Sequence, residues 1–151
     1  MRQKIELLAP AGNKEIFKKA VDAGADAIYC GIDVYNARMN AANLTMEDLA
    51  ECCAYAHERS SYVHLTLNTL VDDSEMDQAV QVACEAYNNG ADAVLVQDMG
   101  LAVKIHEKYP SIPLHASTQM NVFNEAKIKA LKGRGFERVV LPRELTIKEI
   151  T

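Results

Sequence analysis

A six-residue phrase recurs along the chain and restricts how its helices and strands can follow one another. Residues 23–28 read Ala-Gly-Ala-Asp-Ala-Ile, residues 89–94 read Asn-Gly-Ala-Asp-Ala-Val, and residues 134–139 give a looser copy, Arg-Gly-Phe-Glu-Arg-Val. In each copy a helical pattern ends at the glycine, which can adopt the left-handed backbone that terminates a helix. A short β-branched run follows, as expected of a buried parallel strand. The repeat predicts an α/β chain of repeated βα units.

Working outward from these junctions gives six expected strands separated by helices. The strands fall at residues 5–9, 27–30, 62–68, 93–97, 114–117 and 138–141. The helices fall at residues 13–23, 45–59, 74–88, 100–108 and 124–132, and residues 146–149 open a sixth. Residues that cap helices stand at the expected starts: Asn13, Thr45 with Asp48, Asp73 or Ser74, and Asn124. No linker-like stretch divides the chain, so a single domain is expected over residues 1–151.

Alternation within two strands favours one of the two architectures that six βα units admit. In residues 62–68, apolar residues at 63, 65 and 67 alternate with the polar His64, Thr66 and Asn68, and residues 114–117 alternate likewise. A doubly wound sheet buries both strand faces and gives continuous apolar runs. A barrel strand instead has one apolar face toward the helices and one mixed face toward the interior. We therefore expect an incomplete TIM-type (β/α) barrel of six parallel strands, with its helices outside and the chain stopping before the last two of eight strands.

The composition of the chain limits the cellular compartments and the kinds of binding partner that can be expected. The net charge of −5 and the sequence pI of about 5.4 argue against sequence-independent binding of nucleic acid, which needs clustered Lys and Arg. No apolar run approaches the roughly 18 residues that a membrane helix needs. The four cysteines, Cys30, Cys52, Cys53 and Cys84, form no CxxC pair, which favours a reducing compartment. The cytoplasm is the expected location.

Candidate ligand-binding residues follow from position, because a barrel gathers the carboxyl ends of its strands at one rim. Polar residues that end or follow the expected strands are Arg38, Asn68, Gln97, Asp98, Ser117, Gln119, Asn121, Arg143 and Glu144. Their amides and hydroxyls suit the orientation of a polar ligand by hydrogen bonds. Two simpler roles compete with binding: Asp98 can cap the following helix, and Arg143 and Glu144 can form surface ion pairs.

No residue pattern names a reaction. His64 and His115 can face the barrel interior together, but a core role is favoured over a metal site because no zinc-like spacing accompanies them. His115 and Ser117 lie two apart on one strand face, about 7 Å, which is too far for a serine–histidine hydrogen bond. No phosphate-binding glycine loop is present in the sequence.

The rim segments resemble the N-terminal half of the U32 peptidase, or collagenase-like protease, family. The matching segments are ELLAPAGN at 6–13, GADAIYCG at 24–31, YNAR at 35–38, NTL at 68–70, VQDMG at 96–100, HASTQMN at 115–121 and LPREL at 141–145. The ordered set spans nearly all of the chain, and it is this order that makes the resemblance specific.

The resemblance implies a barrel enzyme, with two activities open. The family is labelled peptidase without a defined catalytic group, so the chain is expected to be the N-terminal barrel portion of a peptidase-like enzyme acting on peptide. Other members are implicated in hydroxylating tRNA or rRNA bases or ubiquinone, and bind a 4Fe–4S cluster through four cysteines beyond the region matched here. No cysteine of this chain aligns with those ligands, so no cofactor is expected within residues 1–151. A non-catalytic fragment or binding module is the third alternative, and residues 1–151 alone are expected to be inactive.

An interrupted barrel also predicts self-association. Six of eight strands leave the first and the last strand as open edges, which can pair with another copy. Residues 139–141 are Val-Val-Leu, an uncharged run of the kind that invites such pairing. The expected interface includes residues 5–8 or 139–145.

Overall fold

The computed structural model describes residues 5–37 and 43–150 and forms one six-stranded parallel sheet in the order β1-β2-β3-β4-β5-β6. The strands are β1 (Leu8–Ala11), β2 (Ala27–Gly31), β3 (Tyr62–Leu67), β4 (Ala93–Val96), β5 (Leu114–Ala116) and β6 (Phe136–Val139). Each strand pairs with the next one along the chain, and the order never reverses. This topology confirms the barrel wall and is incompatible with a doubly wound sheet. The sheet is not closed.

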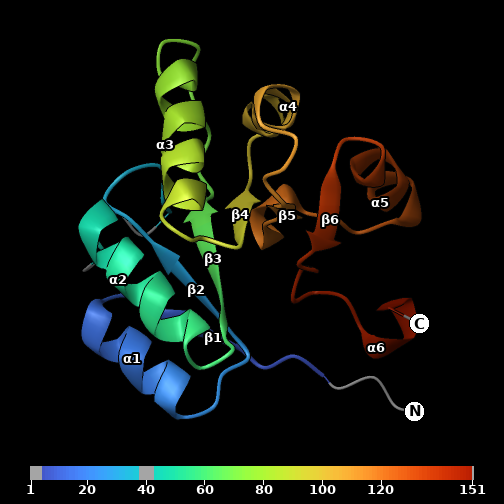
Figure 1. The fold of residues 1–151 in the computed structure, drawn as a ribbon. Coiled ribbons are helices and arrows are strands. Elements are labelled where there is room, and N and C mark those ends of the chain that lie inside the picture. Colours follow the sequence, from blue (N-terminus) through green and yellow to red (C-terminus); the bar gives the residue numbers. More distant parts are fainter. Residues whose placement is uncertain (1–4, 38–42, 151) are drawn as a thin grey trace.

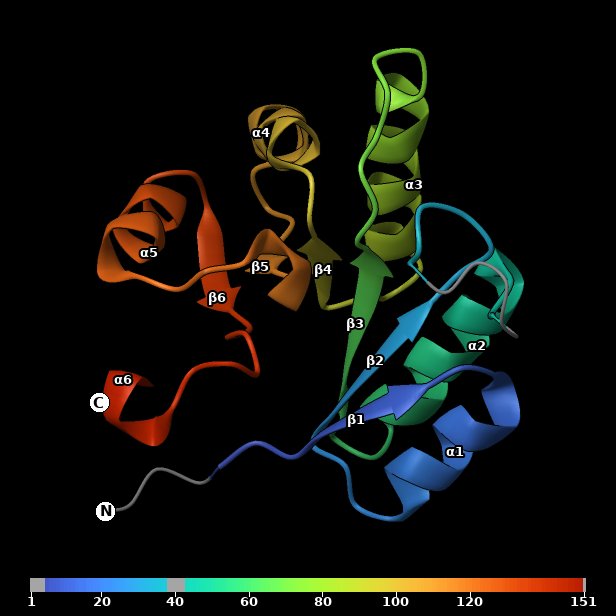
Figure 2. The same cartoon turned by 180° about the vertical axis from the view of Figure 1, so that it is seen from behind.

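The helices form an arc around the outside of the sheet (Figures 1 and 2). They are α1 (Lys14–Asp22), α2 (Met46–His57), α3 (Met76–Asn88), α4 (Met99–Lys108), α5 (Glu125–Lys132) and α6 (Ile147–Ile150), with a 3₁₀ turn η1 (Thr118–Met120) after β5. The core fills the layer between sheet and helices, with fully buried side chains such as Phe17, Leu49, Leu65, Leu101 and Leu114. No helix in the described ranges is long and apolar enough to cross a membrane.

The repeated phrase has two physical roles in the structure. Its glycines end helices or turns with left-handed backbone, at φ 92° for Gly24, 101° for Gly90 and 82° for Gly135. Its aspartates tie each new strand to the start of a neighbouring one. Asp26 accepts a hydrogen bond from the Leu7 amide at 2.9 Å, and Asp92 accepts one from the Val63 amide at 2.7 Å. Each aspartate thus fixes where two strands begin relative to one another.

Several expected helix starts are confirmed and one is wrong. The side chains of Asn13 and Asn124 accept hydrogen bonds from the amides three residues on, and Thr45 and Asp48 form a reciprocal capping box. Helix α3, however, begins at Met76 with Glu75 in the cap position and no side-chain cap bond, so neither Asp73 nor Ser74 caps it. Residues 74 and 75 belong to a turn that precedes the helix.

The bounds of the two edge strands differ from expectation by two to three residues. Strand β1 is Leu8–Ala11 rather than residues 5–9, because pairing with β2 begins at Leu8 opposite Ala27 and Ile5 is 90% exposed. Strand β6 is Phe136–Val139 rather than residues 138–141, because Phe136 is buried in the core and pairs with Leu114 at the start of β5. An edge strand has one partner only, so its ends are set by that single neighbour.

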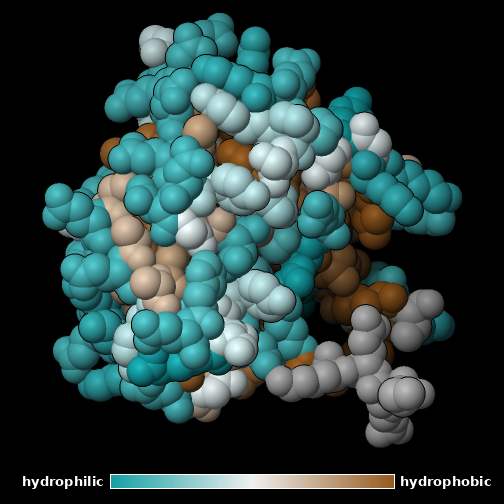
Figure 3. Space-filling model, viewed as in Figure 1, coloured by the Kyte–Doolittle hydropathy of each residue, from teal (hydrophilic) through white to brown (hydrophobic). Residues whose placement is uncertain are grey.

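The open side of the wall lies between β6 and β1. An ion pair between Arg138 of β6 and Glu6, which precedes β1, joins the two edges across this gap. Apolar side chains are exposed on the same side: Ile5 and Leu7 before β1, and Ile147 and Ile150 in α6. Figure 3 shows apolar surface at the right of the molecule, where β6 and α6 lie in Figure 1.

Replacement of Asp92 by alanine tests the role of the repeat. The substitution removes the acceptor for the Val63 amide and for His57 Nε2, which lies 3.0 Å from the same carboxylate oxygen. We expect the free energy of unfolding to fall by about 1–3 kcal/mol in chemical denaturation. Asp73→Ala, in the turn before α3, is the control and should change stability by less than about 0.5 kcal/mol. Equal stability of Asp92→Ala and wild type would contradict the role.

The open edges predict that the isolated chain self-associates. The mass measured by light scattering should rise with concentration in the micromolar range, since uncovered edges and apolar surface favour pairing. A double substitution, Ile5→Lys with Leu7→Lys, should lower the mass toward that of a monomer. Ile16→Lys, on the outer face of α1 where the side chain is 46% exposed, should not. A monomer at every concentration would rule the prediction out.

Candidate functional site

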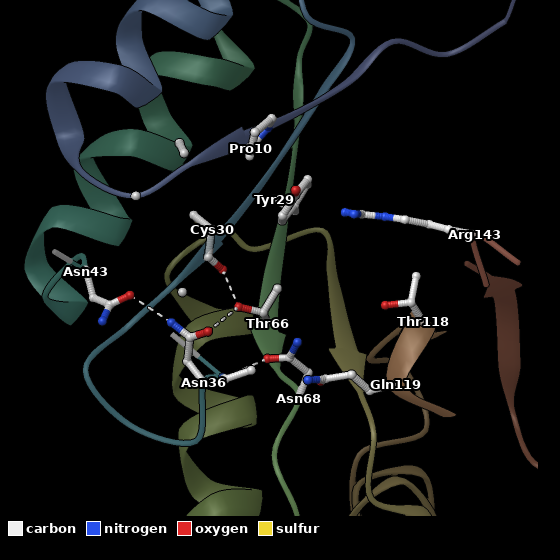
Figure 4. Close-up of a pocket in the computed structure, with 14 residues that line it drawn as sticks. Pro10, Tyr29, Cys30, Asn36, Asn43, Thr66, Asn68, Thr118, Gln119 and Arg143 are labelled. Atoms are coloured by element: carbon white, nitrogen blue, oxygen red, sulfur yellow. Dashed lines mark hydrogen bonds between the residues drawn. The ribbon is translucent and has the colours of Figure 1, made fainter. Parts of the chain in front are cut away.

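A polar cavity of about 270 Å³ opens at the carboxyl ends of the strands (Figure 4). Its wall is built from the ends of β1, β2 and β3, the loop after β2, the 3₁₀ turn after β5 and the segment after β6. The lining residues are Pro10, Ala11, Gly12, Tyr29, Cys30, Gly31, Asn36, Ala37, Asn43, Thr66, Asn68, Thr118, Gln119 and Arg143. Segments far apart in the sequence meet here because every parallel strand delivers its end to the same rim.

Three of the candidate residues, Asn68, Gln119 and Arg143, line this cavity. The others in the described ranges do not. Asp98 accepts a hydrogen bond from the Leu101 amide at 2.8 Å and so caps α4, and the Ser117 hydroxyl accepts one from the Gln119 amide at 3.3 Å. Gln97, Asn121 and Glu144 are outside the lining, and Asn121 adopts left-handed backbone at the end of η1. Arg38 lies outside the described residues.

Asparagine side chains fasten the loop after β2 to the rim (Figure 4). Asn36 is buried, and its side-chain Nδ2 donates a hydrogen bond to the side-chain Oδ1 of Asn43 at 2.7 Å. The Thr66 hydroxyl lies 3.5 Å from the side-chain oxygen of Asn36. Asn68 accepts a hydrogen bond from the Ala37 amide at 3.2 Å. Gly31 is required beneath Asn36, because a Cβ there would lie 1.9 Å from the Asn36 amide nitrogen. Part of the amide content of this rim therefore shapes the cavity rather than facing a ligand.

Arg143 supplies positive charge to the cavity. Figure 4 shows its guanidinium extended into the cavity toward Tyr29. It forms no hydrogen bond or ion pair with another residue in the described ranges, so its five donors are available to a ligand. An arginine in this position suits a phosphate or carboxylate, which it can bind through two parallel hydrogen bonds.

Two histidines lie on the interior face of the sheet. His64 and His115 come from β3 and β5, and their rings meet edge to face with centroids 4.7 Å apart. His64 is aligned with Tyr29 of the cavity wall, and it lies two residues before Thr66 on the same strand face. The pair therefore lies next to the cavity, one layer further into the interior. The two rings thus lie together on the interior face, as the alternation of their strands allowed.

These histidines are neutral at pH 7. Burial lowers the pKa of His64. Burial, followed by repulsion from Arg138 and from His64 when that ring is protonated, lowers the pKa of His115 to about 4. The His115 Nδ1 atom is buried without a hydrogen-bond partner among the described residues. His115 is thus a buried core residue, as the sequence favoured, but its Nδ1 atom is left without a hydrogen bond. No group of three or more potential ligands in those residues is placed to hold a metal ion.

Three of the four cysteines, Cys30, Cys52 and Cys53, are poor nucleophiles. Burial raises the pKa of Cys30, and it raises the pKa of Cys52 to about 11 and of Cys53 to about 12. These thiols are protonated at neutral pH, whereas catalysis and metal binding need the thiolate. The described part of the chain thus offers a polar, arginine-bearing cavity but no activated cysteine beside it.

Sequence reasoning missed several polar lining residues, among them Tyr29, Asn36, Thr66 and Thr118. Thr66 could have been found from the alternation of its strand, since it shares the polar face with Asn68. Asn36 carries a weaker signal, because an asparagine in a long loop is as easily a turn residue as a buried one. Tyr29 carries none, since tyrosine is common in buried strands.

Comparisons with known proteins agree on a single family. The family model for Peptidase family U32 matches residues 12–151. A 23S rRNA 5-hydroxycytidine synthase of Escherichia coli (strain K12) is 40% identical over 147 residues, 97% of this chain and 22% of that protein. A tRNA hydroxylation protein of Bacillus subtilis (strain 168) is 34% identical over 98% of this chain and 35% of its own length. A collagenase of Porphyromonas gingivalis is 30% identical over 96% of this chain and 34% of its own length.

Solved structures support the fold. A U32 peptidase superimposes with a TM-score of 0.74 at 12% identity, covering 93% of this chain and 60% of the other. Oxaloacetate acetylhydrolase superimposes with a TM-score of 0.64 at 10% identity, covering 96% of this chain and 61% of the other. The chain spans only about a fifth to a third of the curated relatives' length.

The buried His115 predicts loss of stability in mild acid. Its pKa of about 4 in the folded chain is below the ordinary 6.5, so the unfolded chain binds more protons between these values. Stability should be full above pH 6.5 and fall by roughly 3 kcal/mol as the pH drops to 4. Denaturation across this range should show a smaller fall for His115→Leu than for wild type or His106→Leu. An NMR titration that gives His115 a pKa near 6.5 would contradict the prediction.

Proposed function

The chain belongs to peptidase family U32, and we propose that it forms the ligand-binding part of a barrel enzyme that hydroxylates a base in tRNA or rRNA. One observation carries the proposal: the cavity presents Arg143 with amides and hydroxyls, and no activated nucleophile stands among the described residues that line it. This arrangement suits the binding and orientation of a nucleotide better than the cleavage of a peptide bond.

The cavity offers complementary groups for a nucleotide that is not base-paired. Arg143 suits a phosphate, and the side chains of Thr118, Gln119 and Asn68 can hydrogen-bond the edges of a base. The net charge of −5 argues against a long basic track along the RNA backbone. Recognition is therefore local, at the exposed nucleotide and its immediate neighbours. An RNA substrate, together with the lack of a disulfide among Cys30, Cys52, Cys53 and Cys84, supports a cytoplasmic location as part of this proposal.

The iron–sulfur cluster of related hydroxylases does not fit the cysteines of this chain. Cys30 lies on β2, Cys52 and Cys53 on α2, and Cys84 on α3, and burial raises the pKa of the first three. No three of the described ligating side chains come together as a metal site. We propose that these cysteines hold no cluster.

Peptide cleavage is the second candidate, because the collagenase of Porphyromonas gingivalis is 30% identical to this chain. It would need a nucleophile, a base or a metal-bound water at the cavity. Ser117, whose hydroxyl is the nearest to His115 in sequence, is buried, and its hydroxyl accepts a hydrogen bond from the Gln119 amide. Release of gelatin fragments by the purified full-length protein, abolished by Arg143→Ala, would favour this function over RNA hydroxylation.

Deletion of the gene tests the proposal. We expect a hydroxylated pyrimidine nucleoside to disappear from digested tRNA or rRNA, measured by mass spectrometry, and to return with the full-length gene. Arg143→Ala should lower the restored amount at least about tenfold, since a charged hydrogen bond contributes about 1.5–3 kcal/mol. Arg134→Ala is the matched control, because its guanidinium is bound to the Ala130 carbonyl at 2.8 Å on α5. Unchanged nucleosides after deletion would refute RNA hydroxylation.

A further inference from the structure

A second hollow of about 310 Å³ lies beside the polar cavity. It is lined by Val34, Tyr35, Thr69, Leu70, Glu75 and Gln78. The two hollows share a wall made of two segments, residues 34–37 and 68–70, each of which contributes to both. The hydrogen bond from the Ala37 amide to the Asn68 side chain, 3.2 Å, joins these segments. A ligand that extends past this wall would enter the second hollow directly.

Tyr35, which lines the second hollow, has an unusual backbone conformation and a buried side chain. Its backbone is left-handed, with φ 53°, a conformation that is costly for a bulky side chain and is often kept at functional sites. The residue is 8% exposed, and burial followed by the Glu75 charge raises the pKa of its phenol. No hydrogen bond joins its hydroxyl to another described residue, and the side chain lines the hollow. The fold thus holds a strained, buried tyrosine with an unused hydroxyl at the wall.

The chemistry of the hollow suits a flat ring with hydrogen-bond donors. Leu70 is 73% exposed and Val34 is 37% exposed, and such apolar side chains can pack against the faces of a base. Glu75 and Gln78 supply a carboxylate and an amide at the start of α3. The Glu75 carboxylate is engaged only by the Asp72 amide at 3.4 Å among the described residues. Its charge disfavours a phosphate and favours an amino group.

We propose that this hollow binds the unpaired base next to the modified nucleotide, and that it selects a base with an exocyclic amino group: cytosine, adenine or guanine rather than uracil. The proposal rests on the RNA hydroxylation proposed above and adds a sequence preference to it. The Glu75 carboxylate accepts a hydrogen bond from the amino group of the base. The Tyr35 hydroxyl and the Gln78 amide form hydrogen bonds with the other polar atoms of the base, and Leu70 packs against its ring.

Binding of short RNAs to the purified full-length protein tests the subsite. Single-stranded pentanucleotides with a central cytidine or uridine are compared by fluorescence anisotropy, with each neighbour varied among the four bases. At one neighbouring position, the amino-bearing bases should bind about tenfold more tightly than uracil. Glu75→Ala and Tyr35→Phe should reduce this preference to about twofold or less. Asp77→Ala, also in the first turn of α3 but outside this hollow, should leave it unchanged.

Three outcomes would overturn the subsite. One is equal binding of all neighbours by the wild-type protein, and another is a preference that survives both Glu75→Ala and Tyr35→Phe. The third is tight binding of a short apolar peptide that Leu70→Ser abolishes, which would assign the hollow to peptide. Failure of the proposed function is read separately, since it appears as unchanged hydroxylated nucleosides after gene deletion. Loss of those nucleosides without any neighbour preference would reject the subsite alone.

Discussion

The carboxylates of Asp26 and Asp92 set the frame on which the rest of the structure depends. Each binds the backbone amide at the start of a neighbouring strand, Leu7 in one case and Val63 in the other. Side chains alternate between the two faces of a strand, so a slip of the register by one residue would turn every side chain to the opposite face. With the starts fixed, His64 and Thr66 face the interior while Val63 and Leu65 pack against the helices. The cavity follows from this register.

Local patterns were sufficient to predict the fold but not its edges. The repeat, the caps and the alternation in β3 are signals carried by residues close in sequence, and they gave the six strands and their outward helices. The bounds of β1 and β6 depend on pairing with a distant strand, which no local pattern records. The cap of α3 was wrong for a related reason: the polar residues before this helix form a turn, and several of them satisfy the rules for a cap.

The site was predictable in position more than in detail. Barrel topology brings Asn68, Gln119 and Arg143 to one cavity although they follow three different strands. It does not say which amide faces inward, and Asn68 turned out to hold the loop at Ala37 through its oxygen. The missing partner of His115 Nδ1 is likewise a packing result, which depends on contacts between residues far apart in the sequence. Burial lowers the pKa values of His64 and His115, so these interior side chains are neutral, whereas Arg143 brings a positive charge to the cavity beside them.

The order of the sheet also bears on how the chain folds. Every strand pairs with its immediate successor, so each pairing closes a loop of only one helix and its turns. Rapid folding is typical of proteins whose contacts are short in sequence, because little chain entropy is lost at each step. The ion pair between Glu6 and Arg138 is different, as it joins residues 132 positions apart. The wall can therefore grow one βα unit at a time, and the contact across its open side forms only after both ends are in place.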